Sequence, residues 1–230
     1  TTPRGIRYNY IRELGRGTFG ETCAVKNVKG KIFCVKEITL PTSDDESRTH
    51  AINEVELMKT MHHPNIIIYH DSWFQRSRSL CILMEYAPNG ALDTLISSYK
   101  ADGEFFPIHK VEHYLQELAG ALHYCHQTLR VMHRDIKPAN ILVDRLGTLK
   151  LADFGLSKSL GPNTDLCATQ CGSPLYMSPE QCNGEAYTYS ADVWSMGCVL
   201  YEVMCTHSPW IQPYDRWPTQ PILLQRLLHR

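Results

Sequence analysis

The chain reads His133-Arg134-Asp135-Ile136-Lys137-Pro138-Ala139-Asn140 near its middle, which places an aspartate and an asparagine five positions apart with a lysine between them. In this pattern Asp135 can accept a hydroxyl proton, Asn140 can hold a metal ion, and Lys137 can face a phosphoryl group during its transfer. The stretch therefore fits phosphoryl transfer. Eight residues can recur by chance, so the prediction depends on whether the rest of such a site follows in order along the chain.

Composition limits the classes of protein that need to be considered. The chain has 230 residues, a formal net charge of -1 and 43% hydrophobic residues, enough for one large domain or two small lobes. The near-neutral charge gives no reason to expect nucleic acid as a partner. No apolar run reaches membrane-spanning length and the first residues carry no secretory signal, so we expect a soluble, cytoplasmic protein without a membrane partner.

Nine cysteines are scattered along the chain, and no Cys-x-x-Cys motif occurs among them. This spacing argues against a zinc ribbon or a thioredoxin-type motif. We therefore expect reduced and mostly buried thiols, as is usual in cytosolic proteins. Cys167 and Cys171 are the exceptions, because they lie in a polar stretch and are expected to be exposed.

The hydrophobic pattern changes along the chain from strand-like to helical. Alternating runs predict strands over 8–14, 22–28, 32–38, 66–73 and 80–86, and a helix over 47–61 that ends at His63-Pro64-Asn65. A turn cluster at 87–90 then separates this part from one with helices over 111–126 and 190–204 and short strands at 141–143 and 149–151. The apolar residues that recur at helical spacing are Ile52, Val55, Leu57, Met58 and Met61 in the first helix, and Val111, Tyr114, Leu115, Leu118, Leu122 and Cys125 on one face of the second. The polar stretch 156–180 is predicted to be a long loop, which at that length is usually functional or disordered.

A glycine-rich loop lies between the first two predicted strands and reads Gly15-Arg16-Gly17-Thr18-Phe19-Gly20. A dinucleotide-binding fold is the usual alternative for this spacing, but it requires a helix directly after the loop. Because a strand follows instead, a dinucleotide-binding fold is disfavoured, and the glycines fit a loop whose backbone can approach phosphates without side chains in the way. Lys36 on the third strand would then contact the phosphates, and its partner should be Glu54 or Glu56 on the following helix.

These motifs, in this order, resemble the eukaryotic protein kinases over about residues 8–210. The resemblance extends to Met84-Glu85-Tyr86-Ala87 as the hinge, Asp153-Phe154-Gly155 as the magnesium-binding motif, Ser178-Pro179-Glu180 as the end of the activation segment, and Asp192-Val193-Trp194-Ser195-Met196-Gly197 as the start of the central helix. The amino-acid sequences of the segments 63–66, 130–140 and 172–180 are most similar to those of the NIMA-related kinases.

The resemblance implies an α+β, bilobal kinase-like fold. Residues 1–86 would form an N-lobe with a small antiparallel β-sheet and one regulatory helix, and residues 87–230 a mainly helical C-lobe. Together they would make one kinase domain. The last helices of the C-lobe are not found before Arg230, nor is the arginine that pairs with Glu180, so we expect a C-lobe truncated after its central helix.

The resemblance also implies roles for individual residues. Asp135 would be the catalytic base, Lys137 would stabilise the transferred phosphoryl group, and Asn140 and Asp153 would hold Mg²⁺. The family pattern selects Glu54 as the partner of Lys36, and Glu56 would point about 200° away around the helix axis. The residues implied to hold ATP are Leu14, Gly15, Arg16, Gly17, Thr18, Phe19, Gly20, Thr22, Cys34, Lys36, Met84, Glu85, Ala87 and Leu142.

Regulatory residues follow from the same resemblance. Thr169 would be the phosphorylation site, placed there by an upstream activating kinase, and Arg134 would pair with the phosphate. Ser173 would hydrogen-bond near Asp135, and Asp192 would be buried against the backbone of the catalytic loop. Thr22 and Cys34 depart from the usual valine and alanine, which predicts a tighter and less apolar roof for the adenine ring.

Two functions are weighed on this basis. The first is a serine/threonine protein kinase that transfers the γ-phosphoryl group of Mg-ATP to protein hydroxyls, with Lys137 typical of that specificity. The alternative is a truncated, non-catalytic nucleotide-binding or scaffolding pseudokinase, which the early end and the altered adenine roof favour. Every catalytic position is present, which favours the kinase. The NIMA-related likeness would imply roles in cell division and at centrosomes, basal bodies and cilia.

Overall fold

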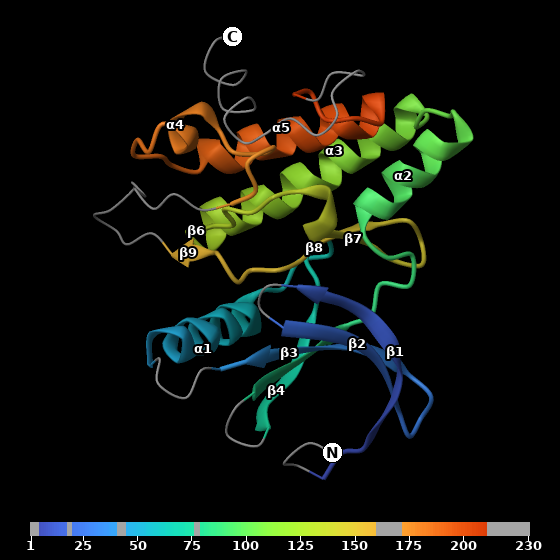
Figure 1. Ribbon diagram of the computed structural model, residues 1–230, viewed down its shortest axis with the longest axis vertical. Coiled ribbons are helices and arrows are strands. Elements are labelled where there is room, and N and C mark those ends of the chain that lie inside the picture. The colour runs from blue at the N-terminus through green and yellow to red at the C-terminus, as the bar shows by residue number, and fades with distance from the viewer. Residues whose placement is uncertain (1–4, 18–19, 41–44, 76–78, 160–171, 211–230) are drawn as a thin grey trace. The chain divides into compact units, whose positions relative to one another are not determined.

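The computed structural model describes residues 5–17, 20–40, 45–75, 79–159 and 172–210 (Figure 1). The chain divides into two compact units, the first made of residues 1–62 and 66–88 and the second of residues 63–65 and 89–230. No helix within the described ranges combines the length and the apolar character that a membrane crossing requires.

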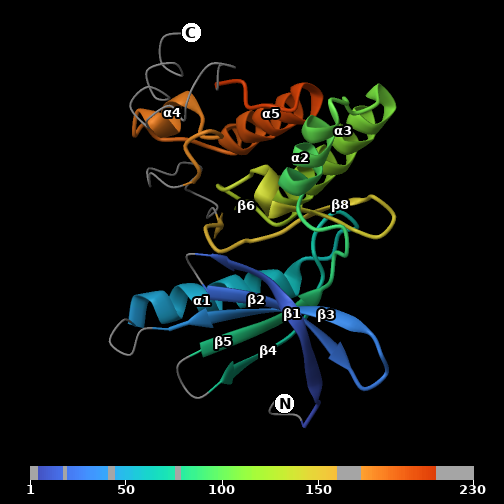
Figure 2. The same ribbon diagram turned by 45° about the vertical axis from the view of Figure 1, so that its right-hand side comes forward.

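The first unit is a five-stranded antiparallel sheet with one helix. Its strands follow the order β1-β2-β3-β5-β4, and helix α1 lies along the sheet (Figure 2). The predicted small antiparallel sheet with one helix is thus confirmed. The bounds are β1 Tyr8–Gly17, β2 Gly20–Asn27, β3 Ile32–Thr39, α1 Asp45–Thr60, β4 Tyr69–Gln75 and β5 Ser79–Glu85.

Local chemistry explains the tight connection between β2 and β3. The Asn27 side chain accepts hydrogen bonds from the backbone N–H groups of Lys29 and Lys31 at 3.0 and 2.9 Å, which is how asparagine stabilises turns. Gly30 takes a φ of 85°, where a side chain would be strained. The connection brings β3, and with it Lys36, directly beside β2.

Alternation along the strands gives the sheet two buried faces. Val25, Phe33, Val35, Cys81 and Leu83 form a cluster on one face, and the residues between them in sequence point to the other. Helix α1 buries Ala51, Val55 and Met58.

The predicted apolar face of α1 was wrong at Ile52, which is 38% exposed. Ala51, Val55 and Met58 lie within about 60° of one another around the helix axis, whereas Ile52 is about 100° from Ala51. Small Ala51 therefore takes the inward position.

The second unit is mainly helical, with α3 and α5 packed against each other (Figure 1). Two short β-ladders, β6 with β9 and β7 with β8, accompany the helices. The bounds are α2 Leu92–Asp102, α3 Ile108–His123, the π-helix η1 Tyr124–Thr128, β6 Val131–Met132, the 3₁₀-helix η2 Pro138–Asn140, β7 Ile141–Val143, β8 Leu149–Leu151, β9 Lys158–Ser159, α4 Pro179–Cys182 and α5 Ser190–Cys205.

Helix α3 buries most of the residues predicted for its apolar face, including Val111 and Leu118, but Leu115 is 43% exposed. Glu117 is buried in its place, because its carboxylate accepts the backbone N–H of Leu149 in β8 at 2.9 Å. A polar side chain with a backbone partner of this kind can replace an apolar one in a core. The prediction for Leu115 was wrong, because the spacing of apolar residues cannot show that a glutamate will find a backbone hydrogen-bond partner in the core.

Several predicted boundaries also shift. Strand β1 continues to Gly17. Strand β4 begins only at Tyr69, and the apolar residues Ile66 and Ile67, which were predicted to start it, are buried in the irregular backbone before it. The predicted loop 156–180 contains β9 and the start of α4. The helix over 111–126 changes to π-helical geometry at Tyr124.

The cysteines of the described segments are free thiols, as predicted. Burial raises the pKa of Cys34, Cys81 and Cys125 to about 12 in each case, so these thiols stay protonated and unreactive. Cys167 and Cys171 lie outside the described residues, and their predicted exposure stays a prediction.

Candidate active site

The backbone of the catalytic loop, residues 133–140, is held by one buried carboxylate on α5. Asp192 Oδ2 accepts the N–H of His133 and Asp192 Oδ1 accepts the N–H of Arg134, both at 2.8 Å. Arg134 itself has a φ of 68°, a left-handed conformation that a non-glycine residue adopts only where its surroundings enforce it. The predicted scaffold role of Asp192 is confirmed, and its two bonds set the direction in which Asp135 leaves the backbone.

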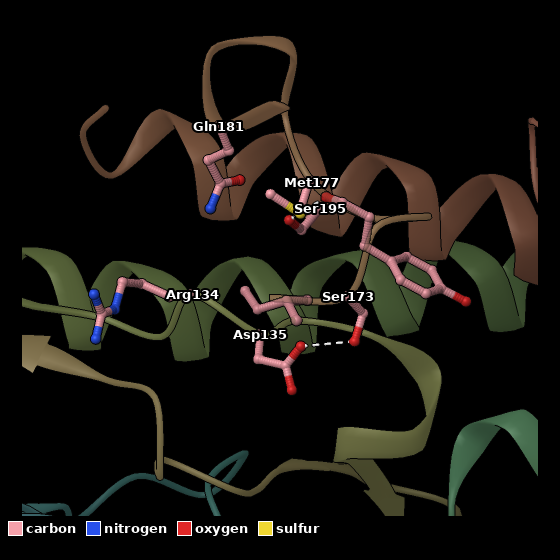
Figure 3. A pocket seen from close by; sticks show the side chains of 8 residues that line it. Arg134, Asp135, Ser173, Met177, Gln181 and Ser195 are labelled. Carbon is pink, nitrogen blue, oxygen red and sulfur yellow. Dashed lines mark hydrogen bonds between the residues drawn. The ribbon is translucent and has the colours of Figure 1, made fainter. Parts of the chain in front are cut away.

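Three side chains donate hydrogen bonds to the Asp135 carboxylate, and Figure 3 shows the one from Ser173. Ser173 Oγ donates to Oδ1 at 2.9 Å, while Lys137 Nζ and Asn140 Nδ2 each donate to Oδ2 at 2.8 Å. Lys137 Nζ also donates to Ser173 Oγ at 2.8 Å, which closes the network. The carboxylate is thus fixed in orientation, with the Lys137 ammonium group beside it.

Residues 172–177 pass close to the catalytic loop and are fastened to α5. A Cβ added to Gly172, whose φ is 114°, would lie 2.8 Å from the carbonyl oxygen of Arg134. Ser195 Oγ donates to the carbonyl of Tyr176 at 2.6 Å, and Tyr176 Oη donates to Glu202 Oε2 at 2.7 Å. Together with the catalytic loop they line the small pocket of Figure 3, formed by Arg134, Asp135, Ile136, Ser173, Tyr176, Met177, Gln181 and Ser195.

Sequence reasoning missed Tyr176 and Glu202. Burial raises the pKa of both groups, that of Glu202 further because Asp93 is near. One signal was present in the sequence: Glu202 is the only aspartate, glutamate, lysine or arginine from 193 to 210. A single charge in an apolar helix calls for a specific partner, and Tyr176 supplies it.

The two predicted metal ligands lie on neighbouring segments of the second unit. The N–H of Ala152 donates to the carbonyl of Asn140 at 2.9 Å, and the carbonyl of Ala152 is 3.0 Å from His133 Nε2. These bonds bring Asp153, the next residue, beside the catalytic loop. With its Nδ2 donating to Asp135, Asn140 offers its amide oxygen, and Asp153 offers a carboxylate.

This donor set fits a hard cation such as Mg²⁺, which takes oxygen ligands and completes its shell with phosphate oxygens and water. In the described part of the chain there is no group of three or more His, Cys, Asp or Glu side chains that could hold a metal ion alone. A metal ion would therefore depend on Asn140 and Asp153 together with a phosphate ligand.

In the first unit, Lys36 Nζ lies 3.1 Å from Glu54 Oε1, and the two side chains are only 13% and 8% exposed. Glu56 points away and pairs with Lys59 on the surface at 2.6 Å. Of the two glutamates that the sequence offered, Glu54 is thus the one that the structure places beside Lys36.

The strand register shows how the residues around Lys36 are arranged. Thr22 pairs with Lys36 across β2 and β3, and Cys34 pairs with Met84 across β3 and β5. Directly paired residues share a face of the sheet, and so do residues two apart on one strand. Thr22, Cys34, Lys36 and Met84 therefore lie on one face.

The glycine-rich stretch leads into β2, which begins at Gly20. A Cβ added to Gly20 would lie 1.8 Å from the carbonyl oxygen of Glu37, so no side chain fits there. Arg16 is exposed and bonds Glu21 at 3.0 Å. Leu14 and Gly15 lie in β1, while Thr18 and Phe19 lie outside the described residues.

The remaining predicted ATP-binding residues are divided between the units. Glu85 ends β5, where its N–H donates to the carbonyl of Ile68 at 2.8 Å, and Ala87 follows it buried in the first unit. Leu142 lies in β7 of the second unit.

Of the regulatory residues, Ser173 and Arg134 are described, and Thr169 lies outside the described residues. Arg134 Nε donates to the carbonyl of Leu156 at 2.5 Å, so its guanidinium is directed toward the segment that follows Asp153-Phe154-Gly155. The pairing of Arg134 with a phosphate on Thr169 stays a prediction.

Comparison with known proteins adds independent information. The protein kinase domain matches residues 8–226 of the chain. NUAK family SNF1-like kinase 2 from Homo sapiens is 40% identical over 197 residues, which cover 85% of this chain and 30% of that protein. Serine/threonine-protein kinase Nek1 from Mus musculus is 35% identical over 201 residues, covering 87% of this chain and 16% of that protein.

Serine/threonine-protein kinase Nek2 from Homo sapiens is 34% identical over 212 residues, covering 90% of this chain and 48% of that protein. The chain thus spans less than half the length of each of these three relatives. The similarity of this chain to Nek1 and Nek2 agrees with the predicted resemblance to NIMA-related kinases. Its similarity to the NUAK protein shows that the resemblance extends beyond that group.

Proposed function

The chain belongs to the serine/threonine protein kinase family, and on that premise we propose that it transfers the γ-phosphoryl group of Mg-ATP to serine and threonine hydroxyls of protein substrates. The observation that carries the proposal is the Asp135 carboxylate, held by Ser173, Lys137 and Asn140 at 2.8–2.9 Å. A catalytic base needs a fixed orientation toward the proton it accepts, and these three hydrogen bonds supply that orientation.

Phosphoryl transfer needs positioning and charge stabilisation more than covalent chemistry by the protein. Asp135 would orient the acceptor hydroxyl and take its proton, while Lys137 would place positive charge beside the transferring group. Asn140 and Asp153 would hold Mg²⁺, which neutralises charge on the phosphate oxygens when bound. Lys36, kept in place by Glu54, would contact the phosphates of ATP.

We also propose the finer features that the family likeness suggests. The chain would be of the NIMA-related type, with an N-lobe over 1–86 and a C-lobe over 87–230. Thr169 would receive a phosphate from an upstream kinase, and Arg134 would bind it. The protein would act in the cytoplasm, in association with the cytoskeleton.

Phosphorylation of a protein substrate with Mg-ATP tests the proposal, with the parent chain compared with Asp135→Asn. Loss of a general base is expected to lower kcat by roughly 10²- to 10⁴-fold. Asp102→Asn is the matched control, because Asp102 is an exposed aspartate at the end of α2, and it should keep the parent rate. Equal incorporation by the parent and Asp135→Asn would refute the kinase proposal.

The non-catalytic alternative makes a different prediction in the same experiment. Thr22 and Cys34 favour it, because they stand where the family usually has valine and alanine, on the face of the sheet that carries Lys36. A parent chain that binds ATP without transferring phosphate would support a nucleotide-binding or scaffolding role. ATP binding measured by calorimetry alongside the rate assay separates the two functions.

A further inference from the structure

The first strand of the sheet carries an arginine that makes a contact far along the chain. Arg12 in β1 donates from Nη2 to Tyr86 Oη at 3.1 Å, and 74 positions separate the two residues. Tyr86 directly follows β5, in the stretch predicted to be the hinge. Strands β2 and β3 lie between β1 and β5 in the sheet, so the hydrogen bond joins two strands that do not pair with each other. The proposed mechanism gives neither residue a role.

A β-bulge in β1 decides which face of the sheet Arg12 occupies. Tyr10 pairs with Val25 of β2, and the next pair is Arg12 with Ala24. Ile11 is therefore an extra residue on β1. In a regular strand Arg12 would share the face of Tyr10, two positions before it, but the extra residue moves Arg12 to the opposite face. Bulges are frequent next to functional sites, where they redirect a side chain.

The bulge places Arg12 at the end of a row of residues that crosses the sheet. Arg12 pairs with Ala24, Ala24 with Cys34, and Cys34 with Met84. Directly paired residues share a face, so the row lies on the face already described for Cys34 and Met84. The side chains in the middle of the row are small, and those at its ends are long. Because Tyr86 stands two residues after Met84, its hydrogen bond with Arg12 connects the two ends of the row.

We propose that Arg12 and Tyr86 form a clasp that retains the nucleotide on this face of the sheet. The inference rests on the proposed function, which places ATP against Leu14 of β1 and Met84 of β5. A nucleotide held in this way leaves when β1 moves away from the end of β5, and the hydrogen bond has to break before that movement. Its donor is a guanidinium, and hydrogen bonds from charged groups are stronger than neutral ones. Arg12 is thus a positioning residue that acts on the nucleotide through β1.

Surface plasmon resonance with the immobilised full chain and unlabelled Mg-ADP measures the dissociation rate constant directly. Arg12→Leu removes the donor at an exposed position, and Tyr86→Phe removes only the hydroxyl and keeps the ring. Arg7→Leu and Tyr10→Phe make the same two changes at exposed positions nearby and are the matched controls.

Arg12→Leu and Tyr86→Phe are each expected to raise the dissociation rate constant of Mg-ADP by roughly 3- to 10-fold, the range for one hydrogen bond that solvent can reach. The double variant should release Mg-ADP no faster than the single variants, because both changes remove the same bond. Arg7→Leu and Tyr10→Phe should match the parent. An unchanged rate constant in either single variant, or effects that multiply in the double variant, would overturn the clasp.

Steady-state kinetics separates nucleotide retention from damage to the fold. Arg12→Leu should raise the KM for ATP by a similar factor without lowering kcat, because the hydrogen bonds of Asp135 lie in the other unit and are unchanged. A lower kcat at an unchanged KM would contradict a role in nucleotide retention.

The two measurements also distinguish this inference from the proposed function. If the parent binds Mg-ADP but transfers no phosphate, the kinase proposal fails while the dissociation rate constants still decide whether the clasp exists. If the parent transfers phosphate and the variants release Mg-ADP at the parent rate, the clasp alone is overturned. A parent that binds no Mg-ADP would overturn both.

Discussion

The ion pair between Lys36 and Glu54 allows stability and activity to be separated. Its side chains are 13% and 8% exposed, with the charged atoms 3.1 Å apart. Removal of one partner leaves a buried charge unpaired, which costs about 3–5 kcal/mol for a fully buried pair. Because some solvent access remains, we expect Lys36→Met to lower the free energy of unfolding by about 3 kcal/mol. For a chain of this size this corresponds to a fall in Tm of roughly 6–12 °C.

The double variant Lys36→Met/Glu54→Leu removes both charges and replaces them with apolar groups of similar size. Such replacements are often neutral, so we expect it to unfold within about 1 kcal/mol of the parent. The coupling free energy between Lys36 and Glu54, obtained from the single variants Lys36→Met and Glu54→Leu and from the double variant, should therefore exceed about 2 kcal/mol. Phosphoryl transfer should be lost in both variants, because the lysine that contacts the phosphates is absent.

Thermal unfolding followed by circular dichroism, together with the Mg-ATP assay, measures both quantities. Glu56→Gln is the control, since Glu56 is 62% exposed in its pair with Lys59 and should change stability by less than about 1 kcal/mol. Additive losses in the double variant would show that the pair is not coupled as a buried charge pair. An active double variant would show that Lys36 has no role in the reaction.

Three further predictions concern other parts of the site. Gly172→Ala should abolish most activity and cost about 1–3 kcal/mol, because its Cβ meets the Arg134 carbonyl at 2.8 Å; a fully active variant would contradict this. Cys34→Ala should lower the KM for ATP at unchanged kcat if the thiol crowds the adenine ring, and an equal or higher KM would refute that reading. Burial raises the pKa of Glu202, so its ionised form destabilises the fold as pH rises through that pKa. Glu202→Gln, which still accepts from Tyr176, should therefore raise Tm at about pH 8 and leave it unchanged at about pH 3, where the carboxyl is protonated in both the folded and the unfolded state; an equal difference at both pH values would contradict the assignment.

Much of the fold could be predicted because the patterns that indicate strands and helices, alternation and helical spacing of apolar residues, lie within short segments of the sequence. Strand alternation placed β2, β3 and β5 within a few residues, and the order of motifs placed Asp135, Lys137 and Ser173 in one region before any contact was known. The apolar faces of α1 and α3 were less accurate at Ile52 and Leu115, because a small residue and a hydrogen-bonded glutamate took the inward positions.

The rest of the site could not be predicted, because it depends on contacts between segments far apart in sequence. The bond from Tyr176 to Glu202 spans 26 residues and that from His126 to Asp192 spans 66. No local pattern specifies which polar residue meets which across such a distance. The π-helical turn at Tyr124 was missed for a related reason, since its sequence continues the helical periodicity of α3.

The attachment of residues 172–177 to helix α5 has a consequence for the construction of chimeras with other kinases. Ser195 and Glu202 fix this loop from one side, and the Arg134 carbonyl leaves room only for a glycine at 172 on the other. If residues 172–177 alone were transferred into another kinase, they would lack Ser195 and Glu202, the α5 residues that hold them in place. The natural unit of exchange is the loop together with α5, and grafts that respect this boundary should retain the geometry of both parents.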